Sequence, residues 1–234
     1  MTKLDYTQGI ELLAGAHSVA ICGHVNPDGD CLGSTLALTL GLRSLGYEVT
    51  PLLATREHPR LYDFLEGYGD FVSACDYHVQ PDVFILVDVP SVSRSGDGEH
   101  VFKRAKKTLV IDHHQGDAAF ADVGYVDNTA AAAGMLVWDF LEQTGVEMTP
   151  QIATCCYTAL VTDTGRFQFQ NADSRAFMAA ARILCPTPFV LNSPPCPVME
   201  SIFTSSSFNK MSRPIFNVTS DAYKCDRIKF ASSK

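Results

Sequence analysis

The stretch Ser18-Val-Ala-Ile-Cys-Gly-His-Val-Asn-Pro-Asp-Gly-Asp-Cys-Leu-Gly-Ser34 decides the fold of this 234-residue chain. Residues 18–23 form a short apolar run that is typical of a buried strand, and the apolar periodicity of residues 32–45 predicts a helix. Pro27 and Gly29 lie between the two and favour a tight turn. A strand, a turn and a helix in this order are expected in an α/β domain.

Three side chains that can bind a metal ion lie on this turn, namely His24, Asp28 and Asp30. The turn leaves the strand at its carboxyl end, where open α/β sheets place their chemistry. No packing requirement asks for one imidazole and two carboxylates on a tight turn, so the pattern favours a metal site. A turn of this kind alone is more often a capped, solvated loop, and the hypothesis therefore depends on further residues.

Strand-like and helix-like segments alternate from residue 18 to residue 184. This alternation predicts an α/β fold with a mostly parallel sheet and helices on both faces. The predicted strands are residues 19–23, 47–53, 83–87, 108–111, 123–126 and a short segment at 166–169. The predicted helices are residues 4–14, 32–45, 58–66, 130–144, 151–162 and 174–184.

The last fifty residues break this alternation. Residues 185–234 are rich in proline and serine, and neither the helical nor the strand period persists there. We therefore predict one domain over residues 1–184, followed by an irregular tail over residues 185–234 that is not a second domain.

The composition restricts the functions open to the chain. Hydrophobic residues make up 46% and charged residues 19%, as in globular proteins, and the formal net charge is −8. This charge excludes a broad electrostatic attraction for nucleic acid, so a phosphate-bearing substrate would need bound cations and a few local basic side chains.

The eight cysteines form no C-x-x-C pair, which favours reduced thiols and a cytoplasmic location. The chain has no apolar span of roughly 18 residues and no secretory leader pattern, so neither membrane insertion nor secretion is expected.

Three further clusters follow other buried elements. Asp88 follows one predicted strand, Asp112-His113-His114 follow the next, and Asp163 ends a predicted helix. An ionised carboxylate at such a position needs a partner, and a divalent cation supplies one. Each cluster alone has a simpler explanation as a helix cap, a chance tripeptide or a turn. Their occurrence in order on one α/β domain predicts a single metal centre.

The donor set indicates which metal is expected. The donors are mostly carboxylate oxygens, joined by two imidazoles and no thiolate. Such donors favour Mn²⁺, with Mg²⁺ or Co²⁺ as alternatives, whereas zinc sites more often contain cysteine or three histidines. Four or more carboxylates carry too much negative charge for one ion, so two ions about 3.5–4 Å apart that share a bridging carboxylate are expected. The predicted ligands are His24, Asp28, Asp30, Asp88, His113 and Asp163.

With these motifs in place, the chain resembles the DHH phosphoesterase family over about residues 5–184. Two longer stretches, Asn26-Pro-Asp-Gly-Asp-Cys-Leu-Gly-Ser-Thr-Leu-Ala-Leu38 and Leu160-Val-Thr-Asp-Thr-Gly-Arg-Phe167, are most similar to the bacterial nanoRNase and pAp phosphatase branch. The resemblance implies a manganese-dependent enzyme that degrades very short RNA and removes the 3′-phosphate of adenosine 3′,5′-bisphosphate.

The resemblance also implies two groups of metal ligands that share Asp88 as a bridge. The first ion would be held by His24, Asp28 and Asp88. The second ion would be held by Asp30, Asp88, His113 and Asp163. Two ions in this arrangement activate water for in-line attack on phosphorus.

Three further residues receive roles from the same resemblance. His114 would face the substrate phosphate, and Asp112 would orient the histidines. Arg94, a few residues after Asp88, is a candidate contact to the phosphate. The expected partners are a short RNA or a nucleotide phosphate; long double-stranded nucleic acid and membranes are not expected, and a homodimer is left open.

Two alternatives stay open. The domain could act on another phosphate bond, such as that of a cyclic dinucleotide or of pyrophosphate. It could instead be a metal-binding interaction module with impaired catalysis. Members of the family continue into a C-terminal substrate-binding domain, DHHA1, and no such domain is recognisable in residues 185–234.

Overall fold

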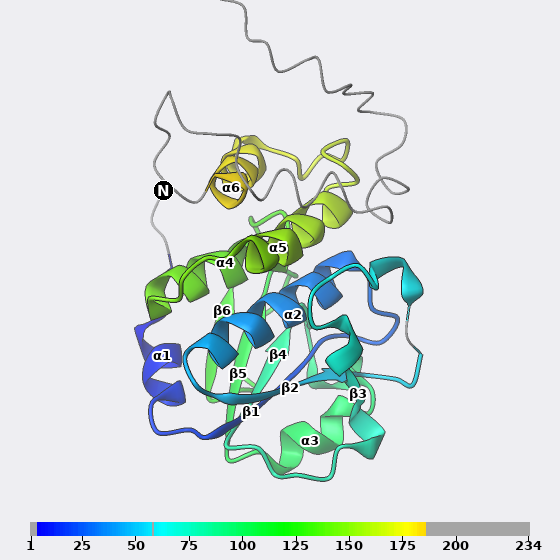
Figure 1. Cartoon of the computed structure of the whole chain (residues 1–234), viewed down its shortest axis with the longest axis vertical. Helices are drawn as coiled ribbons and strands as arrows, with labels where there is room; N and C mark the ends of the chain where they lie inside the picture. Colours follow the sequence, from blue (N-terminus) through cyan, green and yellow to red (C-terminus); the bar gives the residue numbers. More distant parts are fainter. Residues whose placement is uncertain (1–3, 58, 186–234) are drawn as a thin grey trace, which may run out of the picture.

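The computed structural model describes residues 4–57 and 59–185. Six strands form one sheet in the order β3-β2-β1-β4-β5-β6, and every neighbouring pair is parallel (Figure 1). The strands are β1 (Ser18–Cys22), β2 (Glu48–Leu53), β3 (Val72–Ser73), β4 (Val83–Val87), β5 (Lys107–Asp112) and β6 (Val123–Val126). The α-helices are α1 (Thr7–Leu13), α2 (Gly29–Ser44), α3 (Gly98–Arg104), α4 (Ala133–Thr144), α5 (Pro150–Asp163) and α6 (Ser174–Leu184). The predicted α/β class with a parallel sheet is confirmed.

Strand β4 lies at the centre of the core. All five of its residues are buried, which a strand covered on both faces requires and which its uninterrupted apolar sequence supplies. Val83, Ile85 and Val87 pack into the larger hydrophobic cluster on one face of the sheet. Phe84 and Leu86 pack into the smaller cluster on the other face. The sheet is therefore buried between two apolar layers.

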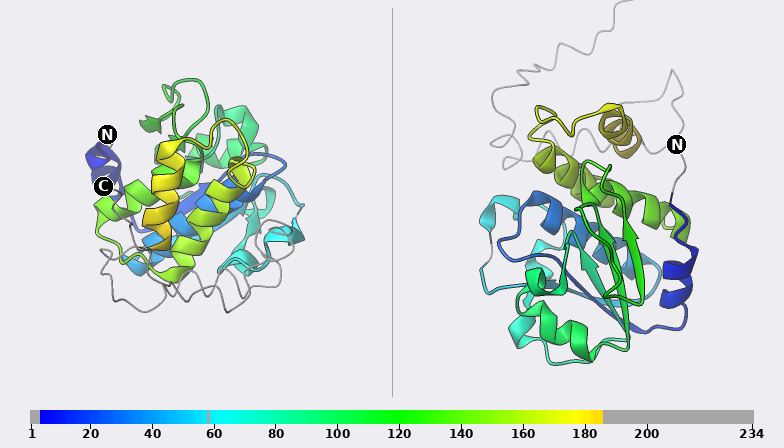
Figure 2. Two further views of the ribbon diagram at one scale, coloured as in Figure 1. Left: turned by 90° about the horizontal axis from the view of Figure 1, so that it is seen from above. Right: turned by 180° about the vertical axis from the view of Figure 1, so that it is seen from behind.

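Helices cover both faces of the sheet, as predicted, but unequally. Helices α2, α4 and α5 pack together on one face, and α6 lies outside them against α5 and α4. Helix α3, which the sequence analysis did not predict, lies on the opposite side of the sheet (Figure 2, right). The side that carries α2 and α5 is the thicker layer, and these two helices carry predicted site residues.

The strand order creates a switch point between β1 and β4. Strands β2 and β3 lie on one side of this pair, and β5 and β6 lie on the other, so the loops that leave β1 and β4 diverge. Ligand sites of open α/β sheets lie in such a crevice at the carboxyl ends of the strands. Cys22 pairs with Leu86, and Val87 pairs with Ile111, so the residues that follow β1, β4 and β5 emerge side by side.

Two predicted elements are wrong. Residues 166–169 form turns and not a strand, and both Arg166 and Phe167 have a left-handed φ of 62°, which no strand contains. Of the helix predicted over residues 58–66, the described part holds only a short 3₁₀ turn at Arg60–Tyr62, and residue 58 lies outside the described residues. Short strand β3 was not predicted. The predicted irregular tail lies, from residue 186 onward, outside the described residues, so the domain boundary stays a prediction.

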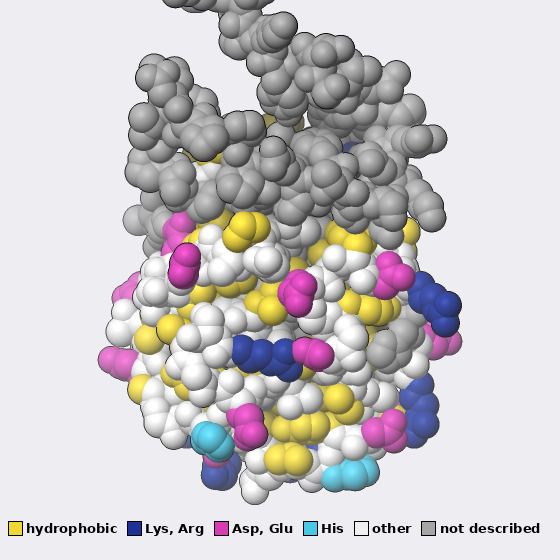
Figure 3. Space-filling model, viewed as in Figure 1, with side chains coloured by type: hydrophobic (Ala, Val, Ile, Leu, Met, Phe, Trp, Pro, Cys, Tyr) yellow, Lys and Arg dark blue, Asp and Glu magenta, His cyan; other side chains and the backbone are white. Residues whose placement is uncertain are grey.

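The surface carries charges of both signs. On the face shown in Figure 3, acidic and basic side chains of the described residues are interspersed and form no broad basic area. This distribution agrees with a chain of net charge −8. Among the described residues, no helix has the length and apolar character that crossing a bilayer requires.

Candidate metal centre

The structure brings the six predicted ligands together at the switch point. Together with His114, they form three groups of three residues whose donor atoms lie within 4.8 Å of one another. The groups are His24 with Asp28 and Asp88, Asp30 with His113 and Asp163, and Asp88 with His113 and His114. Asp88 and His113 each belong to two groups, so the three groups form one continuous cluster.

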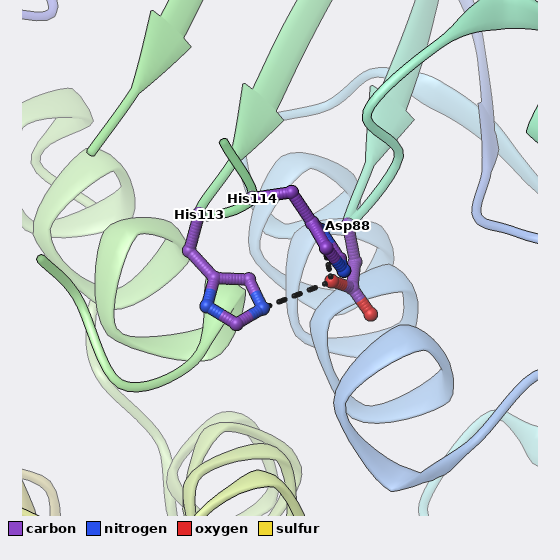
Figure 4. Close-up of side chains that lie close together, drawn as sticks. All are labelled: Asp88, His113 and His114. Carbon is purple, nitrogen blue, oxygen red and sulfur yellow. Dashed lines mark ion pairs between the residues drawn. The ribbon is translucent and has the colours of Figure 1, made fainter. Parts of the chain in front are cut away.

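Asp88 lies at the middle of this cluster, directly after β4. Its Oδ1 lies 3.4 Å from His113 Nε2 and 3.6 Å from His114 Nδ1 (Figure 4). Its Oδ2 lies 3.3 Å from His24 Nε2. The residue is only 2% exposed, and Oδ1 accepts no hydrogen bond within the described chain. Its φ of 58° is left-handed, a conformation that costs free energy in a residue other than glycine and is often found at functional sites.

Backbone carbonyls hold the two buried imidazoles in place. His24 Nδ1 donates to the Val25 carbonyl oxygen at 2.7 Å, and His113 Nδ1 donates to the Ala130 carbonyl oxygen at 3.2 Å. Each ring therefore turns Nε2 toward the carboxylates. Fixing one ring nitrogen in this way is how proteins orient the other for a metal ion.

Asp28 combines the role of a helix cap with a position in the cluster. Its Oδ1 accepts hydrogen bonds from the backbone N–H groups of Asp30 and Cys31, both at 3.0 Å, and so caps the N-terminus of α2. The same oxygen lies 3.7 Å from His24 Nε2. The helix that follows the turn thus fixes the first carboxylate.

Asp30 and Asp163 face His113 from two different helices. Asp30 Oδ2 lies 3.6 Å and Asp163 Oδ2 lies 3.8 Å from His113 Nε2. Asp30 is 1% exposed in the first turn of α2, whereas Asp163 is the last residue of α5. The side chain of Asn171 donates to the backbone carbonyl of Asp163 and holds the end of α5 in position.

Burial and close charges shift the pKa values of the cluster. Burial alone would lower the pKa of both buried histidines, but the carboxylates of Asp28 and Asp88 raise that of His24 to about 10. Asp88, Asp30 and Asp163 likewise raise the pKa of His113 to about 10.

The carboxyl groups divide into two kinds. Burial opposes ionisation of Asp88, yet the two imidazoles hold its pKa well below the ordinary value. Burial and the charge of Asp88 raise the pKa of Asp30, and burial raises the pKa of Asp163. The cluster therefore has more carboxylates than its two buried imidazoles can neutralise, which is the condition a divalent cation relieves.

His114 and Asp112 form a pair at the edge of the cluster. His114 Nδ1 donates to Asp112 Oδ1 at 2.8 Å, and the imidazole remains 43% exposed. This hydrogen bond raises the pKa of His114. Asp112 thus orients His114, whereas the ring of His113 is held by the Ala130 carbonyl.

The backbone of Arg94 lies close to the cluster. Its backbone carbonyl accepts the N–H of Val25 at 2.8 Å, which ties the turn after β4 to the turn after β1. The side chain is exposed. The structure therefore places Arg94 beside the cluster through its backbone, and its contact with a phosphate stays a prediction.

The cluster fits a divalent metal ion. Asp88 Oδ1 is buried without a hydrogen bond, a condition that native proteins rarely leave uncompensated. The donors are oxygens and imidazole nitrogens, which suit Mn²⁺ and Mg²⁺. His24 of one group faces Asp88 Oδ2, and His113 of the group with Asp30 and Asp163 faces Asp88 Oδ1.

Sequence reasoning missed several residues that support the ligands. Ser34 and the first backbone N–H groups of α4 hold Asp30, and Asn171 holds the end of α5. Ser34 lies on the predicted helix 32–45, four residues after Asp30, and this spacing was a usable signal because α2 begins already at Gly29. No local pattern indicates the contact between Asp30 and the start of α4, because Asp30 and Ala133 are 103 positions apart. Asn171 lies eight residues after Asp163, but residues 166–169 were expected to form a strand, which hid the turn that joins the two.

Fold and site together define an α/β protein with a candidate metal centre at the carboxyl edge of its sheet. The chain belongs to the DHH family: the model of the DHH family, N-terminal domain, matches residues 18–160. A bifunctional oligoribonuclease and PAP phosphatase of Thermus thermophilus is 32% identical over 167 residues, which are 71% of this chain and 49% of the relative. A probable enzyme of the same name from Streptococcus mutans is 29% identical over 167 residues, 71% of this chain and 52% of the relative. The chain thus spans about half the length of these curated relatives.

The fold is also found among solved structures. An exopolyphosphatase-related protein from Bacteroides fragilis superposes with a TM-score of 0.73 at 20% identity, over 88% of this chain and 63% of that protein. At this level of identity the likeness establishes the shared fold. The DHH resemblance seen in the sequence is thereby confirmed at the level of family and fold.

Proposed function

We propose that the chain is a two-metal phosphoesterase of the nanoRNase and pAp phosphatase type, with Mn²⁺ as its preferred ion. The observation that carries the proposal is the position of Asp88, buried between two imidazoles with one carboxylate oxygen toward each. A carboxylate shared in this way suits a bridge between two ions. The names of the curated relatives support the choice of short RNA and 3′-phosphoadenosine 5′-phosphate (pAp) as substrates.

Each ion would have its own set of ligands. The first would be held by His24, Asp28 and Asp88, and the second by Asp30, Asp88, His113 and Asp163. When bound, divalent ions lower the pKa of coordinated water and offset the negative charge of a phosphate ester.

The remaining residues act on the substrate. His114 is exposed toward solvent and fixed by Asp112, so its free nitrogen can hold a proton at a phosphate oxygen or at the leaving oxygen. The backbone of Arg94 lies beside the cluster, and its exposed side chain would offer a guanidinium group that suits phosphate recognition. These residues would bind and orient the ester beside the ions.

A substrate panel tests the proposal. Purified chain is assayed with Mn²⁺ on bis-p-nitrophenyl phosphate, pAp, di-adenosine RNA, cyclic di-AMP and pyrophosphate, with Asp163→Ala as the inactive control. Turnover of pAp or di-adenosine RNA that is lost in Asp163→Ala is expected. Preference for cyclic di-AMP or pyrophosphate would assign a different phosphate bond, and bound metal without turnover of any ester would assign a metal-binding module.

A further inference from the structure

The N-terminus of α4 is capped by a residue that lies about a hundred positions earlier in the chain. Ala132, the N-cap residue, makes no side-chain cap, and Asp30 supplies one from α2. Asp30 Oδ2 accepts the N–H of Ala133 at 2.7 Å, and Oδ1 accepts the N–H of Gly134 at 2.9 Å. Both donors are among the N–H groups that a helix cannot satisfy internally.

Ser34 completes the environment of this carboxylate. Its hydroxyl donates to Asp30 Oδ1 at 2.9 Å from one turn further along α2, and the side chain is fully buried. Among the residues that the structure describes, Oδ1 therefore has two donors and Oδ2 has one. Oδ2 also lies 3.6 Å from His113 Nε2, so Oδ2 is the oxygen that faces the centre.

Close packing of three helices makes these hydrogen bonds feasible. A Cβ atom on Gly134 would lie 2.5 Å from Ala159 Cβ on α5, and one on Gly33 would lie 2.5 Å from the Cys155 carbonyl oxygen. Only glycine fits at these two positions, where the helices approach each other closely, because a Cβ atom would push the helices apart. The start of α4 is thus held against Ser34 and Asp30 by the packing of α2, α4 and α5.

We propose that Ser34 is a positioning residue for the metal centre: with the first N–H groups of α4 it locks Asp30 so that Oδ2 alone serves the second ion. The inference rests on the proposed two-metal function and goes beyond it by assigning a role to a residue outside the ligand set. Because Ser34 acts only through Asp30, its loss should weaken the second ion selectively. His24 and Asp28, the ligands of the first ion that the second ion does not share, are held by other contacts.

Titration of the metal-free full chain with Mn²⁺ by calorimetry tests the proposal. In Ser34→Ala, the affinity for the second ion should fall about 10- to 100-fold, the usual cost of losing a residue that orients a ligand, while the first ion binds as in wild type. Ser34→Cys, which keeps the size and a weak donor, should fall between the two. Thr39→Val is the matched control, since Thr39 is also a buried hydroxyl of α2 but donates to the Thr35 carbonyl at 2.8 Å.

The outcomes separate the two proposals. Wild-type chain that binds two ions, together with Ser34 variants that bind both with unchanged affinity, would overturn the role of Ser34 and leave the proposed function intact. An equal weakening of both ions, or an equal effect of Thr39→Val, would reduce Ser34 to a structural residue. Wild-type chain that binds no Mn²⁺ would overturn the proposed function itself.

Discussion

Asp88 Oδ1 lies 3.4 Å from His113 Nε2, and within the described chain this buried oxygen accepts no hydrogen bond. An ionised carboxylate without full compensation is costly in a protein interior. Its other oxygen faces His24 at 3.3 Å, so one side chain connects ligands that follow three neighbouring strands. In the proposed two-metal centre, both ions share this residue.

Replacing Asp88 should therefore abolish metal binding. In Asp88→Asn, Mn²⁺ content measured by elemental analysis should fall below one ion per chain, and hydrolysis of bis-p-nitrophenyl phosphate should fall at least about 100-fold. Asp117→Asn is the control, because this exposed carboxylate caps only a local turn at Ala119. Two bound ions in Asp88→Asn would contradict the bridging role.

His114 and His113 should behave differently when each is replaced by alanine. His114→Ala should keep both ions but lower kcat/KM about 10²- to 10⁴-fold, because a proton donor is lost while the ligands remain. His113→Ala should lose the second ion. Since His114 also belongs to one group of donor atoms, loss of metal in His114→Ala would show that it is a ligand instead.

Removal of metal should destabilise the folded chain. Chelation leaves four carboxylates around two buried imidazoles, whereas Mn²⁺ at about 100 times its Kd would add about 2.7 kcal/mol of stability per site. Thermal unfolding should show a Tm that rises with added Mn²⁺ and falls with EDTA. A Tm that does not respond to either would argue against a metal centre in the folded state.

The stability of the chain in acid should depend on Asp82, which lies at the opposite end of β4 from the centre. Lys106 and the N–H groups of Ser18 and His17 hold the pKa of Asp82 below its ordinary value. A carboxyl whose pKa is lower in the folded state stabilises the protein above about pH 4 and loses that contribution as the pH falls.

Asp82→Asn should therefore destabilise the chain more at pH 7 than at about pH 3, as measured by urea unfolding at each pH. Metal content should be unchanged, because the residue is remote from the ligands. An equal loss at both pH values would mean that the charge of Asp82 does not contribute.

Helix packing beside the centre should not tolerate a Cβ at Gly33. A Cβ there would meet the Cys155 backbone carbonyl at 2.5 Å, so Gly33→Ala should lower the free energy of unfolding by about 1–3 kcal/mol. Gly69→Ala is the matched control, since a Cβ on exposed Gly69 would meet nothing within 4 Å and should leave stability unchanged or about 0.4–1 kcal/mol higher. Urea unfolding of both variants checks the difference.

Much of the fold could be read from the sequence because the buried strands are continuous apolar runs. Strand β4 was predicted with its observed bounds, since a strand covered on both faces must be apolar throughout. The strand predicted over residues 166–169 was wrong, because Phe167 and Phe169 are typical strand residues, whereas the left-handed φ of Arg166 and Phe167 is imposed by their surroundings. Helix α3 was missed because it is short and carries few apolar residues.

The sequence by itself determined the kind of centre: oxygen and imidazole donors that lie on the segments following buried strands or at the end of a buried helix. Parallel strands bring their carboxyl ends to one edge, so the proximity of His24, Asp88 and His113 followed from the pattern. Only the tertiary structure decided how the ligands are held. The Ala130 carbonyl anchors His113, and Ser34 and the start of α4 anchor Asp30. These contacts depend on side-chain rotation and helix packing. Contacts between distant segments leave no periodic signal in a sequence.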